Sequence, residues 1–241
     1  MRHFVAMIAV ACSASWAFGG TMTIASQDFE SNSLSSGTSS NTGFTSSTGV
    51  AFDGLGLGWT ASITNGPISG SDSSDLIGVV NETVASGPGS GSDNNLQTAT
   101  NRNGNWYHVD DADGTFALTF SPVDTTGFSS LMFDFAWAFA PSTYEASDFF
   151  RVSVNGTNVF EATEPVLDVT SNANQFTDVS LDLSAFDGQV LDIVFSVSNN
   201  AGGEDIGFDS LVLSGSVPEP SAFACFAIGC LGLGAIRRRR G

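Results

Sequence analysis

The sequence predicts an antiparallel β-sandwich of about two hundred residues, flanked by two terminal targeting segments. Three observations lead to this prediction. Apolar residues alternate with polar ones, turn-forming residues separate the short apolar stretches, and no long stretch has the 3.6-residue period of an amphipathic helix. About ten short strands are expected, with no helix in the body, and strands at this density are typical of all-β sandwiches.

Residues 1–19 are predicted to form a secretory signal peptide. A short positive start, Arg2-His3, precedes an apolar stretch from Phe4 to Ala14, and Ala17-Phe18-Gly19 fits the small-x-small pattern of a cleavage site. A first transmembrane helix would need a longer apolar stretch. The chain therefore divides into a signal peptide at 1–19, a sandwich domain at 20–216 and a C-terminal segment at 217–241.

The sandwich domain is strongly acidic. It contains 24 of the 25 acidic residues of the chain against Arg102 and Arg151, which gives a net charge of −22. The chain has no lysine, and because Cys12, Cys225 and Cys230 lie outside the domain, no disulfide can form within it. Such a domain repels nucleic acid and attracts divalent cations, of which calcium is the first candidate. We expect no nucleic-acid partner, and stability that comes from burial.

The first half of the domain gives three strand predictions between polar loops. The predicted strands are Thr23–Glu30, Trp59–Ile63 and Leu76–Val84. The intervening passages are rich in Ser, Gly, Thr and Asn, which is the composition of surface loops.

The second half shows clear alternation. Between Leu131 and Phe139 five large apolar residues alternate with smaller ones, which places them on one face of a strand. Asn155-Gly156 is the strongest short signal for a hairpin turn. The strands predicted here are Trp106–Val109, Thr115–Phe120, Leu131–Phe139, Phe150–Val154, Val159–Phe160, Val179–Leu183, Leu191–Val197 and Ile206–Ser214. Their core positions are Phe133, Phe135, Val152, Val154, Leu181, Leu183, Ile193 and Phe195.

The C-terminal segment combines three features in order. Pro218-Glu219-Pro220 precedes an apolar stretch from Ser221 to Ile236, and four arginines follow. As a helix, this apolar stretch would span roughly 24 Å at ~1.5 Å per residue, short of the ~30 Å hydrocarbon core. The arginines should remain on the cytoplasmic side, and the two prolines keep Glu219 in an extended, accessible strip. The arginines are Arg237, Arg238, Arg239 and Arg240.

This order resembles the PEP-CTERM sorting signal, which exosortase-type membrane proteases process. The resemblance covers the proline-glutamate-proline strip, the short hydrophobic helix and the arginine cluster. It implies an exosortase-type protease as a partner, transient membrane anchoring through the C-terminal helix, and an exported protein of the cell envelope, outer surface or extracellular matrix. The alternative is a single-pass tail anchor that is never cleaved, and the placement of Pro218 and Pro220 argues against it.

The domain itself resembles jelly-roll modules of the galactose-binding-like and carbohydrate-binding type. The residues that carry the resemblance are Asp28-Phe29-Glu30 near the start and Ile206-Gly207-Phe208-Asp209 near the end. It implies a jelly-roll-type sandwich in which the first and last strands pair and an acid from each shares a structural calcium ion. Glu30 and Asp209 are the matching positions. That both are ordinary surface carboxylates is the alternative.

Asp110, Asp111 and Asp113 form an alternative calcium site. They precede Gly114 as at the start of a calcium loop, but the next ligands of an EF-hand are missing. A polar turn is the simpler interpretation.

Five aromatic residues could form a platform on which sugars stack. Trp137 shares the parity of the core residues of its strand and is expected inside, and Trp106 and Tyr107 should point to opposite faces. The five are Trp59, Trp106, Tyr107, Trp137 and Tyr144.

No catalytic residue can be assigned. His108 is the only histidine of the domain, no Gly-x-Ser-x-Gly elbow is present, and the clustered acidic motif of concanavalin-like glycosidases is missing. The sequence favours a non-catalytic exported protein with calcium and polysaccharide as candidate ligands. The alternative is a polysaccharide-degrading enzyme on a jelly-roll scaffold, because paired carboxylates could hydrolyse a glycosidic bond.

Overall fold

The computed structural model describes residues 20–30, 59–64, 77–80, 96, 104–110, 114–167, 173–201 and 203–217. The predicted signal peptide, Pro218 and the residues after it, and Asp111 and Asp113 lie outside these residues. No helix in the described part of the chain is long and apolar enough to cross a membrane.

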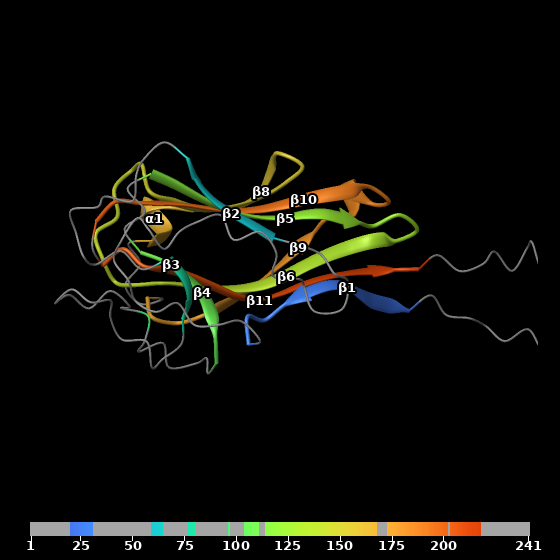
Figure 1. Ribbon diagram of the computed structural model, residues 1–241, viewed down its shortest axis with the longest axis horizontal. Helices are drawn as coiled ribbons and strands as arrows, with labels where there is room; N and C mark the ends of the chain where they lie inside the picture. The colour runs from blue at the N-terminus through green and yellow to red at the C-terminus, as the bar shows by residue number, and fades with distance from the viewer. Residues whose placement is uncertain are drawn as a thin grey trace, which may run out of the picture.

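Two antiparallel sheets pack face to face (Figure 1). The six-stranded sheet has the order β3-β4-β11-β6-β9, with β1 also paired to β11, and the five-stranded sheet has the order β2-β5-β10-β7-β8. The first consists of β1 (Thr21–Gln27), β3 (Ile77–Val80), β4 (Trp106–Val109), β6 (Ser129–Phe139), β9 (Thr177–Asp182) and β11 (Ile206–Ser216). The second consists of β2 (Trp59–Thr64), β5 (Gly114–Asp124), β7 (Phe149–Val154), β8 (Thr157–Thr163) and β10 (Val190–Asn199). A four-residue helix, α1 (Glu164–Leu167), and a 3₁₀ turn, η2 (Ser184–Phe186), lie on either side of β9.

The strand order confirms the predicted jelly-roll-type sandwich. From β4 onward the chain alternates between the sheets except at the β7–β8 hairpin, so that β4, β11, β6 and β9 are neighbours in one sheet and β5, β10, β7 and β8 in the other. This arrangement of two interleaved Greek keys is the jelly roll. The hairpin predicted at Asn155-Gly156 joins β7 to β8, with both residues at positive φ (49° and 77°) as a type I′ turn requires.

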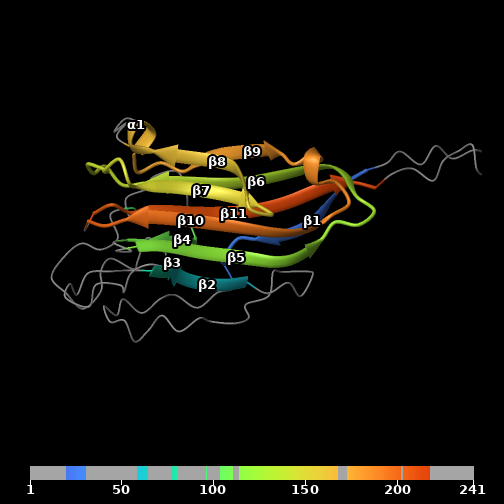
Figure 2. The ribbon, with the colours of Figure 1, turned by 90° about the horizontal axis from the view of Figure 1, so that it is seen from above.

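The first and last strands pair, as the family resemblance implies. Thr21 lies opposite Ser216 and Gln27 opposite Leu211, while β4 pairs with the beginning of β11 along the same edge. In both views β1 and the end of β11 lie side by side at one end of the sandwich, and α1 lies at the other (Figures 1 and 2). Gly20 and Val217 therefore leave the domain next to each other.

The space between the sheets is filled mainly by aromatic rings. Phe195 of β10 and Phe208 of β11 stack across the sandwich with 4.6 Å between ring centroids. The predicted core residues are buried, except that Leu181 is half-buried because its strand, β9, is at the sheet edge. With no disulfide in this domain, burial is the main source of its stability.

A second, smaller apolar cluster covers the outer face of the six-stranded sheet. Trp106 packs there against Phe176 at 5.8 Å between ring centroids, while Tyr107 points into the main core, as the predicted opposite orientations require. Gly207 makes this packing possible, because a Cβ on it would lie only 2.8 Å from the Leu96 side chain. The cluster consists of Val80, Leu96, Trp106, Ala136, Ala138, Ala140 and Phe176.

Candidate functional site

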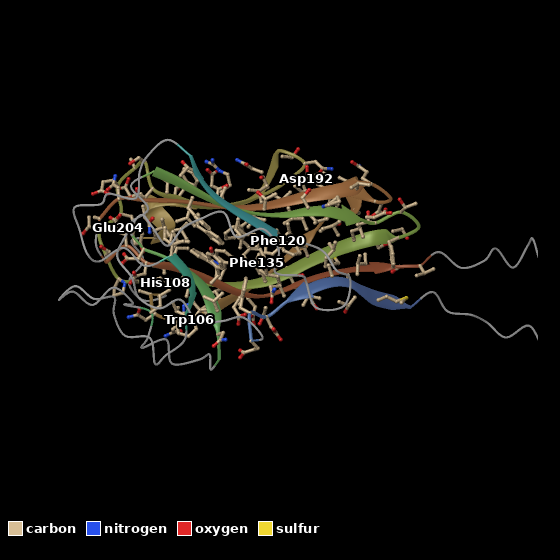
Figure 3. All side chains as sticks on the ribbon, in the orientation of Figure 1. Trp106, His108, Phe120, Phe135, Asp192 and Glu204 are labelled. Carbon is tan, nitrogen blue, oxygen red and sulfur yellow. The ribbon has the colours of Figure 1, made fainter. Side chains whose placement is uncertain are left out.

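Glu204 and His108 lie at the end of the sandwich opposite the paired ends of β1 and β11 (Figure 3), and each belongs to a group that contains acidic side chains. Two groups of potential ligands form there, and within each group one ligand atom per residue lies within 4.8 Å of the others. They come from the end of β4, the β6–β7 loop and the β10–β11 loop. One group is Glu145, Asp148 and Glu204, and the other is His108, Asp110 and Asp205.

Backbone amides hold one oxygen of two of these carboxylates. Glu204 Oε2 accepts hydrogen bonds from the amides of Asn200 (3.0 Å) and Ala201 (3.1 Å). Asp148 Oδ2 accepts one from the Glu145 amide at 2.7 Å. Both side chains are almost completely buried, with exposed fractions of 0% for Glu204 and 1% for Asp148. Their second oxygens, Glu204 Oε1 and Asp148 Oδ1, accept no hydrogen bond from the described residues.

Burial and like charges disfavour ionisation of both carboxyls. Burial raises the pKa of Glu204 to about 7, with the charges of Asp148 and Glu145 adding to the effect and the two amide hydrogen bonds opposing it. Burial likewise raises the pKa of Asp148 to about 6. The pKa of Tyr144 is well above its usual value because the ring is buried beside acids of both groups.

The second group is tied into the fold. His108 Nε2 lies 3.4 Å from Asp205 Oδ1, and both side chains are fully buried. The Asp205 carbonyl accepts hydrogen bonds from the Ala140 amide (2.9 Å) and the Tyr144 hydroxyl (3.1 Å). Asn199 Nδ2 donates to the Val109 carbonyl at 3.1 Å. Polar contacts thus join the ends of β4, β6 and β10 around the two groups.

The predicted calcium ligands Glu30 and Asp209 each accept a hydrogen bond within the domain. Glu30 Oε1 accepts a hydrogen bond from the Asn105 amide at 2.8 Å, and its side chain is exposed. Asp209 is buried, and its Oδ2 accepts one from the Ser210 hydroxyl at 3.2 Å. Among the described residues, neither belongs to a group of three or more potential ligands. A calcium site at Glu30 and Asp209 remains a prediction. Of the alternative site, only Asp110 is described.

The four members of the possible aromatic platform whose side chains are described are all buried and form no exposed stacking surface. Trp106 belongs to the second apolar cluster, and the other three are buried in the main core, where Trp137 was expected. The alternation along β4 places Trp106 on the outer face of the sheet, but it does not show that other side chains cover this residue there. The residues concerned are Trp106, Tyr107, Trp137 and Tyr144.

A different aromatic residue lies on the outer face of the five-stranded sheet. Phe149 is half-buried and belongs to neither apolar cluster, and the Arg151 guanidinium lies 4.2 Å from the centre of its ring. Arg151 Nε also donates to Glu161 Oε1 at 3.1 Å. Small side chains, mostly hydroxyls, make up the neighbouring part of this face. They are Thr115, Ala117 and Thr119 of β5, Val194, Ser196 and Ser198 of β10, and Ser153 of β7.

Sequence reasoning missed both sites for different reasons. The alternation on β7 that places Phe150 and Val152 inside also places Phe149 and Arg151 outside, so that signal was available. Nothing in the local sequence pairs Asp148 with Glu204, because the jelly-roll topology brings them together from loops more than fifty residues apart.

Comparison with known proteins gives distant structural likenesses only. No protein-family model matches the sequence, and no curated protein matches it. The chain is similar to TmCBM61, solved in complex with β-1,4-galactotriose, at 12% identity and a TM-score of 0.38, over 64% of this chain and 86% of that one. It is similar to a cleaved adhesin domain of Lys-gingipain from Porphyromonas gingivalis at 14% identity and a TM-score of 0.39, over 81% of this chain and 98% of that one. It is also similar to a family 11 carbohydrate-binding module from Clostridium thermocellum at 17% identity and a TM-score of 0.36, over 71% of this chain and 96% of that one.

Proposed function

We propose that this chain is an exported, non-catalytic protein of the cell envelope or extracellular matrix whose sandwich binds a neutral polysaccharide. The observation that carries the proposal is the outer face of the five-stranded sheet. There the half-buried ring of Phe149 and the guanidinium of Arg151 lie beside a surface of small, mostly hydroxyl side chains.

The chemistry of this face fits a sugar chain. A pyranose ring offers an apolar face of C–H groups that packs on an aromatic ring, and hydroxyls that pair with arginine and with serine or threonine side chains. Across β5, β10 and β7, Thr115 pairs with Ser198 and Ser198 with Phe149, so the aromatic ring and the hydroxyls share one row. The net charge of −22 on the domain would repel an anionic glycan, which favours a neutral one.

The two chain ends support display from a membrane. Because Thr21 pairs with Ser216, the signal peptide and the sorting segment would attach at the same end of the sandwich. The acidic loop end would then point away from the membrane, and the flat faces would be accessible along their length. Cleavage of the sorting segment by an exosortase-type protease would release the sandwich domain to the cell surface or the extracellular matrix.

The enzyme alternative has less support. A glycosidase needs a carboxyl with a raised pKa in contact with its substrate. Burial raises the pKa values of Asp148 and Glu204, but both side chains are at most 1% exposed, which argues against contact with a glycosidic bond. Binding without cleavage is therefore the function we propose.

Affinity electrophoresis tests the binding face. The protein is run in gels that contain one neutral glucan, galactan or xylan at a time, and the same mixtures are assayed for new reducing ends. Phe149→Ala should weaken retardation by about tenfold, since ring packing contributes ~1 kcal/mol or slightly more. Met22→Ala, which removes an exposed side chain of β1, is the control. Equal retardation of the parent and Phe149→Ala, or release of reducing ends, contradicts the proposal.

Mass spectrometry tests the sorting segment. Replacing Pro218-Glu219-Pro220 with three alanines should leave an uncleaved form held in the membrane, and neutral residues in place of Arg237 to Arg240 should impair retention and sorting. An intact C-terminus ending in Gly241, recovered from the surface fraction of the parent, rules out processing of this segment.

A further inference from the structure

Three carboxylates of the loop end meet without a described positive partner. The exposed Glu145 and the buried Asp148 and Glu204 each offer an oxygen within 4.8 Å of the others. The chain has no lysine, and the one arginine among the described residues, Arg151, is paired with Glu161 on the outer face of the five-stranded sheet. The nearby His108 is directed to Asp205. Buried charges in proteins are normally paired or bound to a metal ion.

Two of these carboxylates each have one buried oxygen that accepts no hydrogen bond from the described residues. Glu204 uses Oε2 for the amides of Asn200 and Ala201 and leaves Oε1 without a hydrogen bond from the described residues. Asp148 uses Oδ2 for the Glu145 amide and leaves Oδ1 in the same way. Both side chains are at most 1% exposed. Outer hydrogen bonds that orient a carboxylate while one oxygen remains available are a common feature of metal ligands.

We propose that Glu145, Asp148 and Glu204 bind one hard divalent cation, calcium in preference to magnesium. The donor set consists of carboxylate oxygens, which are the ligands of calcium, magnesium and manganese. Calcium takes six to eight oxygens in a flexible geometry, and loop carbonyls can complete such a shell, whereas magnesium demands a near-octahedral one. Burial is the main cause of the raised pKa values of Asp148 and Glu204, and the charge of Glu145 adds to it at both. A bound cation would offset both effects.

This site differs from the one predicted at Glu30 and Asp209. It lies in the β6–β7 and β10–β11 loops, whereas Glu30 follows β1 and Asp209 lies within β11. It also does not depend on polysaccharide binding or on sorting, so its test is independent of theirs.

Calorimetric titration with calcium chloride tests the proposal. The full chain is purified in detergent, stripped with chelator and titrated at pH 7.5. Extracellular calcium modules bind with dissociation constants of about 10⁻⁴ to 10⁻³ M, which sets the concentration range. We expect Glu204→Gln and Asp148→Asn each to bind one ion fewer than the parent, or to bind it about tenfold more weakly or worse. Magnesium chloride should give the weaker titration of the parent.

Matched variants distinguish calcium binding at this site from calcium binding elsewhere on the acidic domain. Glu161→Gln makes the same chemical change on the exposed outer face and should leave calcium binding unchanged. Glu30→Gln and Asp209→Asn should leave this ion in place, and the loss of a further ion in them would support the second site. A parent that binds no calcium overturns the proposal. The proposal is also overturned if Glu204→Gln binds the same number of calcium ions as the parent with the same affinity. Melting curves in chelator check that each variant is folded.

Discussion

Two regions of this sandwich are equally buried but contribute to stability in opposite ways. Between the sheets, Phe135, Phe195 and Phe208 are removed from water and gain packing contacts. At the loop end, Asp148 and Glu204 are just as inaccessible, yet their burial costs free energy because carboxylates lose their hydration. The comparison shows that burial alone does not identify what holds a protein together. Where a chain buries charge without a partner, a bound ligand is the expected means of compensation.

Truncation in the aromatic core should have the largest effect. Phe135 is 2% exposed and packs against Phe160 and Phe195 of the opposite sheet at 5.4 and 5.6 Å between ring centroids. Phe135→Ala should lower the free energy of unfolding by about 3 to 5 kcal/mol, measured by denaturant titration. Val190→Ala, at a residue that is 53% exposed, is the control and should change it little. An unchanged midpoint in Phe135→Ala would show that this ring is not part of the core.

Calcium bound at the loop end should have the next largest effect. If the ion binds only the folded protein, a calcium concentration one hundred times its dissociation constant adds about 2.7 kcal/mol of stability. Differential scanning calorimetry of the parent in calcium and in chelator measures this increment. The same increment should persist in a core variant such as Phe135→Ala, since the two regions are distant and independent. A melting temperature that ignores chelator contradicts the loop-end site.

In chelator, stability should fall as the pH rises. Folding raises the pKa of Asp148 from 3.8 to about 6 and that of Glu204 from 4.5 to about 7, so the folded protein holds protons that the unfolded chain has released. Stability from these two groups is fully present below pH 3.8 for Asp148 and below pH 4.5 for Glu204, and it is lost as the pH rises through about 6 and about 7 respectively. Glu145, Tyr144, Asp205 and Asp110 are the other titratable groups around them. The melting temperature should depend less on pH when calcium is added. A melting temperature that rises with pH in chelator would contradict the raised pKa values of Asp148 and Glu204.

The surface ion pair should have the smallest effect. Arg151 and Glu161 pair on the outer face of the five-stranded sheet, where both side chains are partly exposed. Pairs of this kind contribute ~0.2 to 1 kcal/mol and weaken with salt. Glu161→Gln should therefore shift the free energy of unfolding by less than about 1 kcal/mol. A larger loss, equal in low and high salt, would mean that Glu161 has a packing role.

The sequence predicts the core better than the loop end because the two depend on different kinds of information. Alternation along β6 and β10 places each apolar side chain without reference to the rest of the fold. The half-burial of Leu181 and the cover over Trp106 needed the sheet order and the position of Leu96, which no local pattern contains. The direction of the Glu204 side chain is set by the amides of Asn200 and Ala201, a tertiary detail of one loop.

The melting temperature of Glu204→Gln in chelator at pH 7.5 tests the contrast between the two regions most directly. Glutamine is close in shape to glutamate, its side-chain oxygen can accept the two amide hydrogen bonds, and it carries no charge. We predict that the variant melts at a higher temperature than the parent in chelator and shows less response to calcium. A variant that melts at a lower temperature than the parent in chelator, with its calcium response intact, would contradict this contrast.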